Sequence, residues 1–336
     1  MLKGTPSAFR AIDMRTATLA PILGAGLLAA AAFAQAAETT LIKIGDHDVP
    51  VVKGGLYDRY RSNPPLSVIA AEAPDTDLSW FKGITKEKVN IGFESWSPNF
   101  YYENRRITVI FTADLNRLRE LMPPKVLEKV QPLQVWPGRG VVALTAYSYQ
   151  YCDNDSYNEI GLSVVTSKPG STSWGPLSLM GQSFSDDFWG FVLKLPVDTE
   201  LARVRGVVGY NLPKWLTRID YNESDKDVVV KIFDSQTQAL DVTLETRKLN
   251  VGSSKETFVT NHFTNLDQQG NLQTGHTTAR QLSQASTSSR DAVKLTLTDG
   301  SLSGFISSLK LGKMLKYEYV PDFQAVLYAP KPLAKE

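Results

Sequence analysis

Cysteine is almost absent from this chain, because Cys152 is the only one among its 336 residues. An intrachain disulfide needs two cysteines and a thiolate metal cluster needs several, so the sequence excludes both. Histidine is nearly as scarce, and His47, His262 and His276 are too far apart in sequence to form a local metal-binding motif. We therefore expect no metal site.

An excess of charge of either sign is also lacking: 36 Lys and Arg residues face 35 Asp and Glu residues. Such a balance gives no broad electrostatic field, so we expect neither nucleic acid nor an anionic membrane as a partner. Hydrophobic residues make up 42% of the chain. A chain of this length can bury a full core, as one large domain or as one domain with an extension.

The N-terminus has the pattern of a secretory signal peptide. Arg10 and Arg15 precede an apolar run over about 19–33, and small residues at 32–36 offer cleavage sites. We predict a signal in residues 1–36, starting at Met1 or Met14, and an exported protein, periplasmic or secreted, without membrane contact after cleavage. A membrane anchor is the alternative, but this run is shorter than the roughly 20 residues of a membrane span.

Residues 37–96 are rich in chain breakers and contain no chemical motif. Two short strands, 41–44 and 89–93, are the regular elements that this segment predicts. We interpret it as an N-terminal extension that packs on the domain formed by residues 97–336.

The remainder, 97–336, is mostly a series of alternating apolar and polar runs separated by Gly, Pro, Asn and Asp. This pattern predicts antiparallel β structure rather than alternating strands and helices. A short helix starts after Thr112 or Asp114, a second covers 301–310, and the Ser/Thr/Gln-rich tract 275–290 is interpreted as an exposed loop. The predicted strands are 106–111, 140–151, 159–167, 190–195, 202–208, 227–233, 239–246, 256–263, 293–297 and 323–328.

Lys214 is the candidate nucleophile, because it stands among apolar and aromatic residues in the stretch 206–216. Loss of water around an amine disfavours its charged form, and a neutral lysine can form a Schiff base with a carbonyl compound. Pro213 fixes the preceding φ angle, and Gly206 and Gly209 permit close approach of the backbone. The alternative is a surface lysine whose stem lies on apolar surface.

Three short motifs occur in a fixed order along the chain. The first combines 104–106 (Asn-Arg-Arg) with 112–118, the second is 157–161 (Tyr-Asn-Glu-Ile-Gly), and the third joins 197–206 to 212–214 (Leu-Pro-Lys). In this order they resemble the acetoacetate decarboxylase family, whose segment with an Asp, a Glu and a Gly leads to an aromatic-Pro-Lys-Lys sequence. The resemblance covers about 97–330.

The resemblance implies a fold, a reaction and a set of residues. The fold would be α+β and mostly antiparallel, with a barrel-like β core that encloses an apolar pocket and a few short helices. Lys214 would form the imine, Glu159 would move protons, and Arg105 would receive the substrate carboxylate. Arg106 is the alternative arginine, since the register here is uncertain by one residue. Other expected substrate-binding residues are Tyr210, Leu212 and Trp215. No cofactor is implied.

One departure from the family pattern concerns Trp215, which stands where the family has a second lysine. The cationic neighbour that helps to lower a lysine pKa is therefore missing, and acetoacetate decarboxylase is the standard example of that device. The leading hypothesis is an exported enzyme that decarboxylates a β-keto acid. The alternatives are aldol or dehydration chemistry through the same imine, and a noncatalytic small-molecule-binding protein. Whether the chain forms a homo-oligomer stays open.

Overall fold

The computed structural model describes residues 38–252 and 254–333. The predicted signal peptide, residues 1–36, lies outside the described residues. Among the helices that the structure describes, none is long and apolar enough to cross a membrane.

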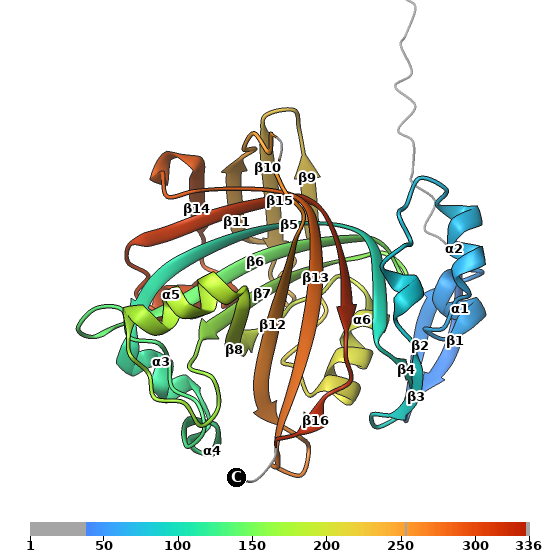
Figure 1. Cartoon of the computed structure of the whole chain (residues 1–336), viewed down its shortest axis with the longest axis horizontal. Coiled ribbons are helices and arrows are strands. Elements are labelled where there is room, and N and C mark those ends of the chain that lie inside the picture. The colour runs from blue at the N-terminus through green and yellow to red at the C-terminus, as the bar shows by residue number, and fades with distance from the viewer. Residues whose placement is uncertain (1–37, 253, 334–336) are drawn as a thin grey trace, which may run out of the picture. The chain divides into compact units, whose positions relative to one another are not determined.

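A closed barrel of seven strands forms the centre of the fold (Figure 1). Seven strands in a closed ring cannot all be antiparallel to both of their neighbours, so one neighbouring pair must be parallel. That pair is β8–β12. All other neighbours in the barrel are antiparallel, which confirms the predicted mostly antiparallel, barrel-like α+β fold. The barrel strands are β5 (Asn99–Asp114), β6 (Arg139–Cys152), β7 (Tyr157–Val165), β8 (Asp187–Lys194), β12 (Thr257–Leu266), β13 (Leu272–Thr287) and β15 (Met314–Leu327).

A separate four-stranded sheet covers the outer face of β5, β6 and β7. Along β5, Ile107 and Val109 point outward and pack with Val230 and Leu244 of this sheet in the main hydrophobic core. Side chains of successive strand residues point to opposite faces, so the neighbours of Ile107 and Val109 on β5 point into the barrel. The sheet consists of β9 (Ile219–Glu223), β10 (Asp227–Phe233), β11 (Leu240–Arg247) and β14 (Val293–Leu297).

Short helices lie beside the barrel strands, the four-stranded sheet and the N-terminal hairpin. The helix that follows β5 starts as predicted at Asp114, whose carboxylate accepts a hydrogen bond of 3.0 Å from the Arg117 N–H. The short elements of the barrel region are α3 (Leu115–Leu121), α4 (Pro124–Leu127), α5 (Pro176–Ser185), α6 (Glu200–Val204), the π-helical turn η2 (Arg205–Gly209), η3 (Arg290–Ala292), α7 (Ser301–Ser308) and the two-residue strand β16 (Lys331–Pro332).

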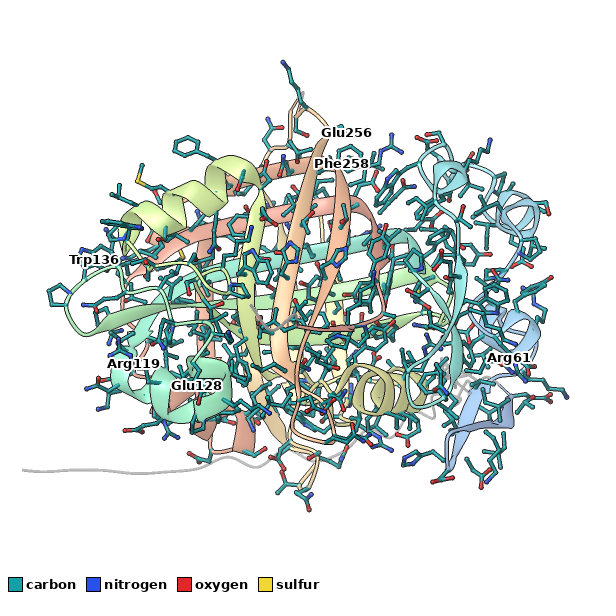
Figure 2. All side chains as sticks on the ribbon, turned by 60° about the horizontal axis from the view of Figure 1, so that its bottom comes forward. Arg61, Arg119, Glu128, Trp136, Glu256 and Phe258 are labelled. Atoms are coloured by element: carbon teal, nitrogen blue, oxygen red, sulfur yellow. The ribbon has the colours of Figure 1, made fainter. Side chains whose placement is uncertain are left out.

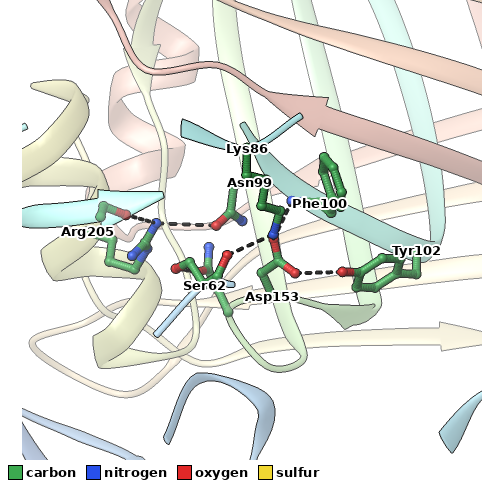
Figure 3. Close-up of polar contacts among 9 residues, drawn as sticks. Ser62, Lys86, Asn99, Phe100, Tyr102, Asp153 and Arg205 are labelled. Carbon is green, nitrogen blue, oxygen red and sulfur yellow. Dashed lines mark hydrogen bonds and ion pairs between the residues drawn. The ribbon is translucent and has the colours of Figure 1, made fainter. Parts of the chain in front are cut away.

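The N-terminal segment packs against one end of the barrel, with Arg61 on the side of the molecule opposite to Trp136 (Figure 2). Its elements are β1 (Thr39–Ile44), β2 (His47–Val52), α1 (Leu56–Tyr60), α2 (Leu66–Glu72), η1 (Phe81–Gly83), β3 (Glu87–Asn90) and β4 (Glu94–Ser97). The β1–β2 hairpin buries Ile44 and Val49 against α6. A buried ion pair between Lys86 and Asp153 of the β6–β7 turn forms a second contact with the barrel (Figure 3).

Three sequence predictions are wrong. The predicted strand 89–93 is instead the end of β3 and the turn that joins it to β4, because the chain forms a short hairpin here. Residues 202–208 form the end of α6 and the turn η2 rather than a strand, because Thr199 caps a helix whose Leu201 and Val204 pack on the β1–β2 hairpin. Residues 275–290 mostly belong to β13 rather than to an exposed loop. Their polar character reflects the barrel interior, which Thr277 and Gln281 help to line.

Candidate active site

One row of paired residues runs across three neighbouring barrel strands. Arg106 of β5 pairs with Tyr147 of β6, and Tyr147 pairs with Glu159 of β7. All three side chains line the same cavity inside the barrel. Residues paired directly across a sheet share a face, so this register alone places an arginine and a glutamate on one wall.

Arg105 points to the opposite face of β5. Its guanidinium forms a 2.9 Å ion pair with Glu223 of β9, and its side chain is 41% exposed. Arg105 is therefore not among the cavity-lining residues, whereas Arg106, the alternative that the sequence left open, is.

A break in the register of β5 lies just before these two arginines. Tyr101 and Arg106 both line the cavity, although strict alternation would place residues five apart on opposite faces. The pairing of β5 with β6 shifts between Tyr101 and Asn104, which changes the parity of the strand. Sequence spacing could not reveal this irregularity.

Lys214 reaches the row from the segment between η2 and β9. Val197 joins this segment to β7: it bridges Glu159 on one side, and its N–H donates to the Trp215 carbonyl oxygen at 3.0 Å on the other. The result is a close ion pair, with 2.5 Å between Lys214 Nζ and Glu159 Oε2. Both side chains are buried, at 8% and 9% exposure.

Gly206 makes room for the lysine stem. A Cβ atom built on Gly206 would overlap the Cδ and Cε atoms of Lys214. Gly206 lies in the π-helical turn, and its carbonyl oxygen accepts a 3.1 Å hydrogen bond from the Leu212 N–H. Close backbone approach at this glycine was a prediction from the sequence, and the structure confirms it.

Four tyrosines surround the ion pair, and sequence analysis did not single them out as a group. Tyr149 donates a long hydrogen bond of 3.4 Å to Glu159 Oε1, and burial raises the pKa of Tyr149 well above its usual value. This phenol therefore stays protonated as a donor. The Tyr157 ring centroid lies 5.6 Å from Lys214 Nζ, and the Tyr157 hydroxyl lies 3.2 Å from that of Tyr101. The sequence pattern that could have revealed part of this group is the alternation Tyr147-Ser148-Tyr149, which places two tyrosines on the same face of a strand.

Arg106 is buried but not fully paired. Its side chain is 7% exposed, Nη2 lies 3.3 Å from Glu318 Oε2, and Nε has no hydrogen-bond partner. Burial acts to raise the pKa of Glu318, but the charges of Arg106 and Lys316 outweigh it and hold this pKa below its usual value. Glu318 is thus the resident anion beside Arg106, and the guanidinium has donor capacity left for another one.

The cavity has a volume of about 800 Å³. Of the predicted site residues, Lys214, Glu159, Arg106 and Leu212 line it. Tyr210 is buried elsewhere, and its carbonyl oxygen accepts hydrogen bonds from Asn265 and Gln273. Trp215 packs against the main core outside the barrel.

The arrangement combines three chemical functions in one enclosed space. An amine and a carboxylate within hydrogen-bonding reach can exchange a proton, which leaves a nucleophilic amine and a neutral acid. An arginine on the same row can bind an anion. Among the described residues, no group of three or more His, Cys, Asp or Glu side chains could hold a metal ion.

A scan of protein-family models and a search of curated proteins give no match. Solved structures do match. An acetoacetate decarboxylase from Legionella pneumophila superposes with a TM-score of 0.51 and 13% identity, over 71% of this chain and 88% of that one. The enduracididine biosynthesis enzyme MppR in complex with pyruvate gives a TM-score of 0.50 and 13% identity, over 70% of this chain and 91% of that one. The chain therefore has the acetoacetate decarboxylase-like fold.

Proposed function

We propose that this protein is a Schiff-base enzyme that decarboxylates a β-keto acid. The observation that carries the proposal is the buried Lys214–Glu159 pair, which lies in a cavity with a partly unpaired arginine. The fold shared with an acetoacetate decarboxylase supports the same class of reaction.

The reaction begins with proton transfer from the Lys214 ammonium to Glu159. The neutral amine attacks the keto carbon, Glu159 returns a proton to the carbinolamine oxygen, and water leaves as the iminium forms. The bond to the carboxylate carbon then breaks, carbon dioxide departs, and the electron pair moves through the new C=C bond to the imine nitrogen. Protonation at carbon and hydrolysis of the imine release the ketone and restore Lys214.

Arg106 binds the substrate carboxylate in this scheme. Its guanidinium lines the cavity, with Nη2 beside Glu318 and Nε without a hydrogen-bond partner. Tyr149 holds Glu159 in place by donating to the oxygen that does not contact Lys214. Each of these groups lies on the wall of the same cavity.

The proposal is tested by measuring carbon dioxide release from acetoacetate and larger β-keto acids. Lys214→Ala should lower the rate by on the order of a thousandfold or more, because the nucleophile is gone. Lys255 also lines the cavity but is exposed, so Lys255→Ala is the matched control and should keep the wild-type rate.

A noncatalytic binding protein is the second candidate. The close contact between Lys214 and Glu159 favours it, because an amine engaged with a carboxylate at 2.5 Å is not free to attack a carbonyl carbon until that contact breaks. If wild-type protein binds β-keto acids without releasing carbon dioxide from any of them, the binding protein replaces the enzyme.

Export is a further part of the proposal and rests on the sequence of residues 1–36. We expect the mature protein to start near Ala37 or Glu38. Mass spectrometry of the N-terminal peptide from fractionated cells tests this. A full-length chain in the cytoplasmic fraction would contradict it.

A further inference from the structure

Small side chains keep the barrel open beyond the active row. The next row along the strands contains Thr108, Thr145 and Gly161, and the row after it contains Ile110, Ala143 and Ser163. All six line the cavity. A barrel of about eight strands is just wide enough for its own side chains to fill. Gly161, Ala143 and Ser163 therefore leave space that larger residues would occupy.

This space is long in the direction of the strands. Glu159 and Val165 of β7 both line the cavity, six residues apart. At about 3.3 Å per residue, the cavity extends roughly 20 Å along β7. A volume of about 800 Å³ lies in the range of sites that enclose drug-sized ligands. A four-carbon keto acid would occupy only a small part of it.

Helix α5 lies over the end of this space that is distant from Glu159. Leu179 and Ser183 of α5 line the cavity together with Val165. No residue of this helix is buried, although Leu179 is half-buried. A helix that packed on a filled barrel would bury an apolar stripe. Helix α5 therefore covers open space that an apolar ligand can occupy.

The charged side chains that line this part of the cavity are Lys316 and Glu318 of β15 and Asp186 at the end of α5. Lys316 Nζ lies 2.6 Å from Glu318 Oε1, and Glu318 in turn contacts Arg106. The one carboxylate offsets one of the two positive charges. The opposite wall, formed by Ala143, Ser163 and Val192 of β6, β7 and β8, carries no charge.

We propose that the substrate of this site is a β-keto acid with an unbranched acyl chain of medium length. This inference rests on the proposed function. The carboxylate and the keto group lie at Arg106 and Lys214, and the chain extends past Gly161, Ala143 and Ser163 towards α5.

A homologous series of substrates tests the inference. Each methylene that enters an apolar site improves affinity roughly fourfold. From acetoacetate through β-ketohexanoate and β-ketooctanoate to β-ketodecanoate, kcat/KM should rise by about this factor per methylene until the space is filled. A flat series, with acetoacetate as good as β-ketodecanoate, would overturn the inference and leave the proposed function intact.

Two variants block the space without touching the active row. Ala143→Phe should lower kcat/KM for β-ketodecanoate at least about tenfold and change that for acetoacetate less than about twofold. Ser163→Phe is a second, independent block in case the first variant does not fold. Ala143→Ser, which adds only a hydroxyl group, is the control. Equal losses for both substrates in a folded variant would contradict the inference.

Binding of decanoate separates the acyl-chain site from the chemistry, because this acid has no keto group. Calorimetry on Lys214→Ala should detect decanoate binding, and adding Ala143→Phe should weaken that binding at least about tenfold. Binding of decanoate by a wild-type protein that turns over no β-keto acid would retain the chain site and refute the proposed enzyme. Absence of decanoate binding would overturn the inference whatever the enzyme does.

Discussion

Among the residues that the structure describes, two lysines are buried beside a carboxylate, and of these two Lys214 lines the cavity. Lys86 Nζ lies 2.5 Å from Asp153 Oδ2, the same distance as that between Lys214 Nζ and Glu159 Oε2. The exposures are also alike, at 7% for the Lys86 side chain and 8% for that of Lys214. Burial and an ion pair therefore do not distinguish a candidate catalytic lysine from a structural one.

The surroundings of the two pairs differ. Asp153 also accepts hydrogen bonds from the Phe100 N–H and the Tyr102 hydroxyl, and Lys86 donates to the Ser62 carbonyl oxygen (Figure 3). Burial lowers the pKa of Lys86 and raises that of Asp153 despite their mutual attraction, as expected for charges that are costly to bury. Lys214 and Glu159 instead open onto about 800 Å³ of space. Access for a ligand is what separates them.

The largest expected effect is the loss of stability when the structural pair Lys86–Asp153 is broken. Lys86→Met leaves the Asp153 carboxylate buried without its cation, so the free energy of unfolding should fall by about 3–5 kcal/mol. Urea unfolding measures the loss. Replacing both partners, with Lys86→Met and Asp153→Asn together, should recover part of it. A Lys86→Met protein as stable as wild type would show that this pair does not join the N-terminal segment to the barrel.

The corresponding change in the cavity pair should affect activity. Glu159→Gln preserves the shape of the side chain but removes the group that exchanges a proton with Lys214. We expect kcat for β-keto acid decarboxylation to fall by about a hundredfold or more. Wild-type kcat in this variant would exclude Glu159 as the proton carrier.

A smaller effect is expected where the backbone makes room for Lys214. Gly206→Ala introduces a Cβ that overlaps the lysine stem, so the amine shifts and kcat should fall by roughly 10- to 100-fold. Gly304 of α7 has no atom within 4 Å of the position of an added Cβ, and Gly304→Ala is the matched control. The control should keep full activity. Equal activity of the two variants would mean that the lysine tolerates displacement.

The smallest effect concerns Asp198, which accepts two 2.8 Å hydrogen bonds from Asn158, the residue before Glu159. Burial raises the pKa of Asp198 to about 6. A carboxyl whose folded pKa lies above its unfolded value of about 4 stabilises the fold below that value and loses this contribution as pH rises to 6.

Wild-type stability relative to Asp198→Asn should therefore fall by about 2 kcal/mol between pH 4 and pH 6. Urea unfolding of both proteins across this range measures the difference. Parallel curves for the two proteins would contradict a raised pKa at Asp198.

Much of the fold could be predicted from the local sequence, because a strand shows an alternation of apolar and polar residues and a helix start shows a capping residue. Strands β10 and β14 have the bounds that the sequence indicated. The prediction failed for 275–290, because a polar tract resembles a loop when the barrel interior that β13 helps to line is itself partly polar. It failed for 202–208, because packing on the N-terminal hairpin selects a helix.

The candidate site could be predicted only in part, for reasons of register. Lys214 and Glu159 meet in the structure as the ordered motifs indicated. Regular alternation along 104–114 puts Arg105 and Arg106 on opposite faces of β5, and only the pairing of the folded strands shows which face is inside the barrel. Tyr210 and Trp215 are close to Lys214 in sequence, but the turn at Asn211, with φ of 53°, and the Val197 contacts direct them away from the cavity.

Reductive trapping tests the contrast between the two buried lysines most directly. Wild-type protein is treated with borohydride in the presence of acetoacetate or β-ketodecanoate, and its peptides are mapped by mass spectrometry. We expect an adduct on Lys214, none on Lys86, and none at either position in Lys214→Ala. No adduct on Lys214 with any β-keto acid that the folded protein binds would contradict it.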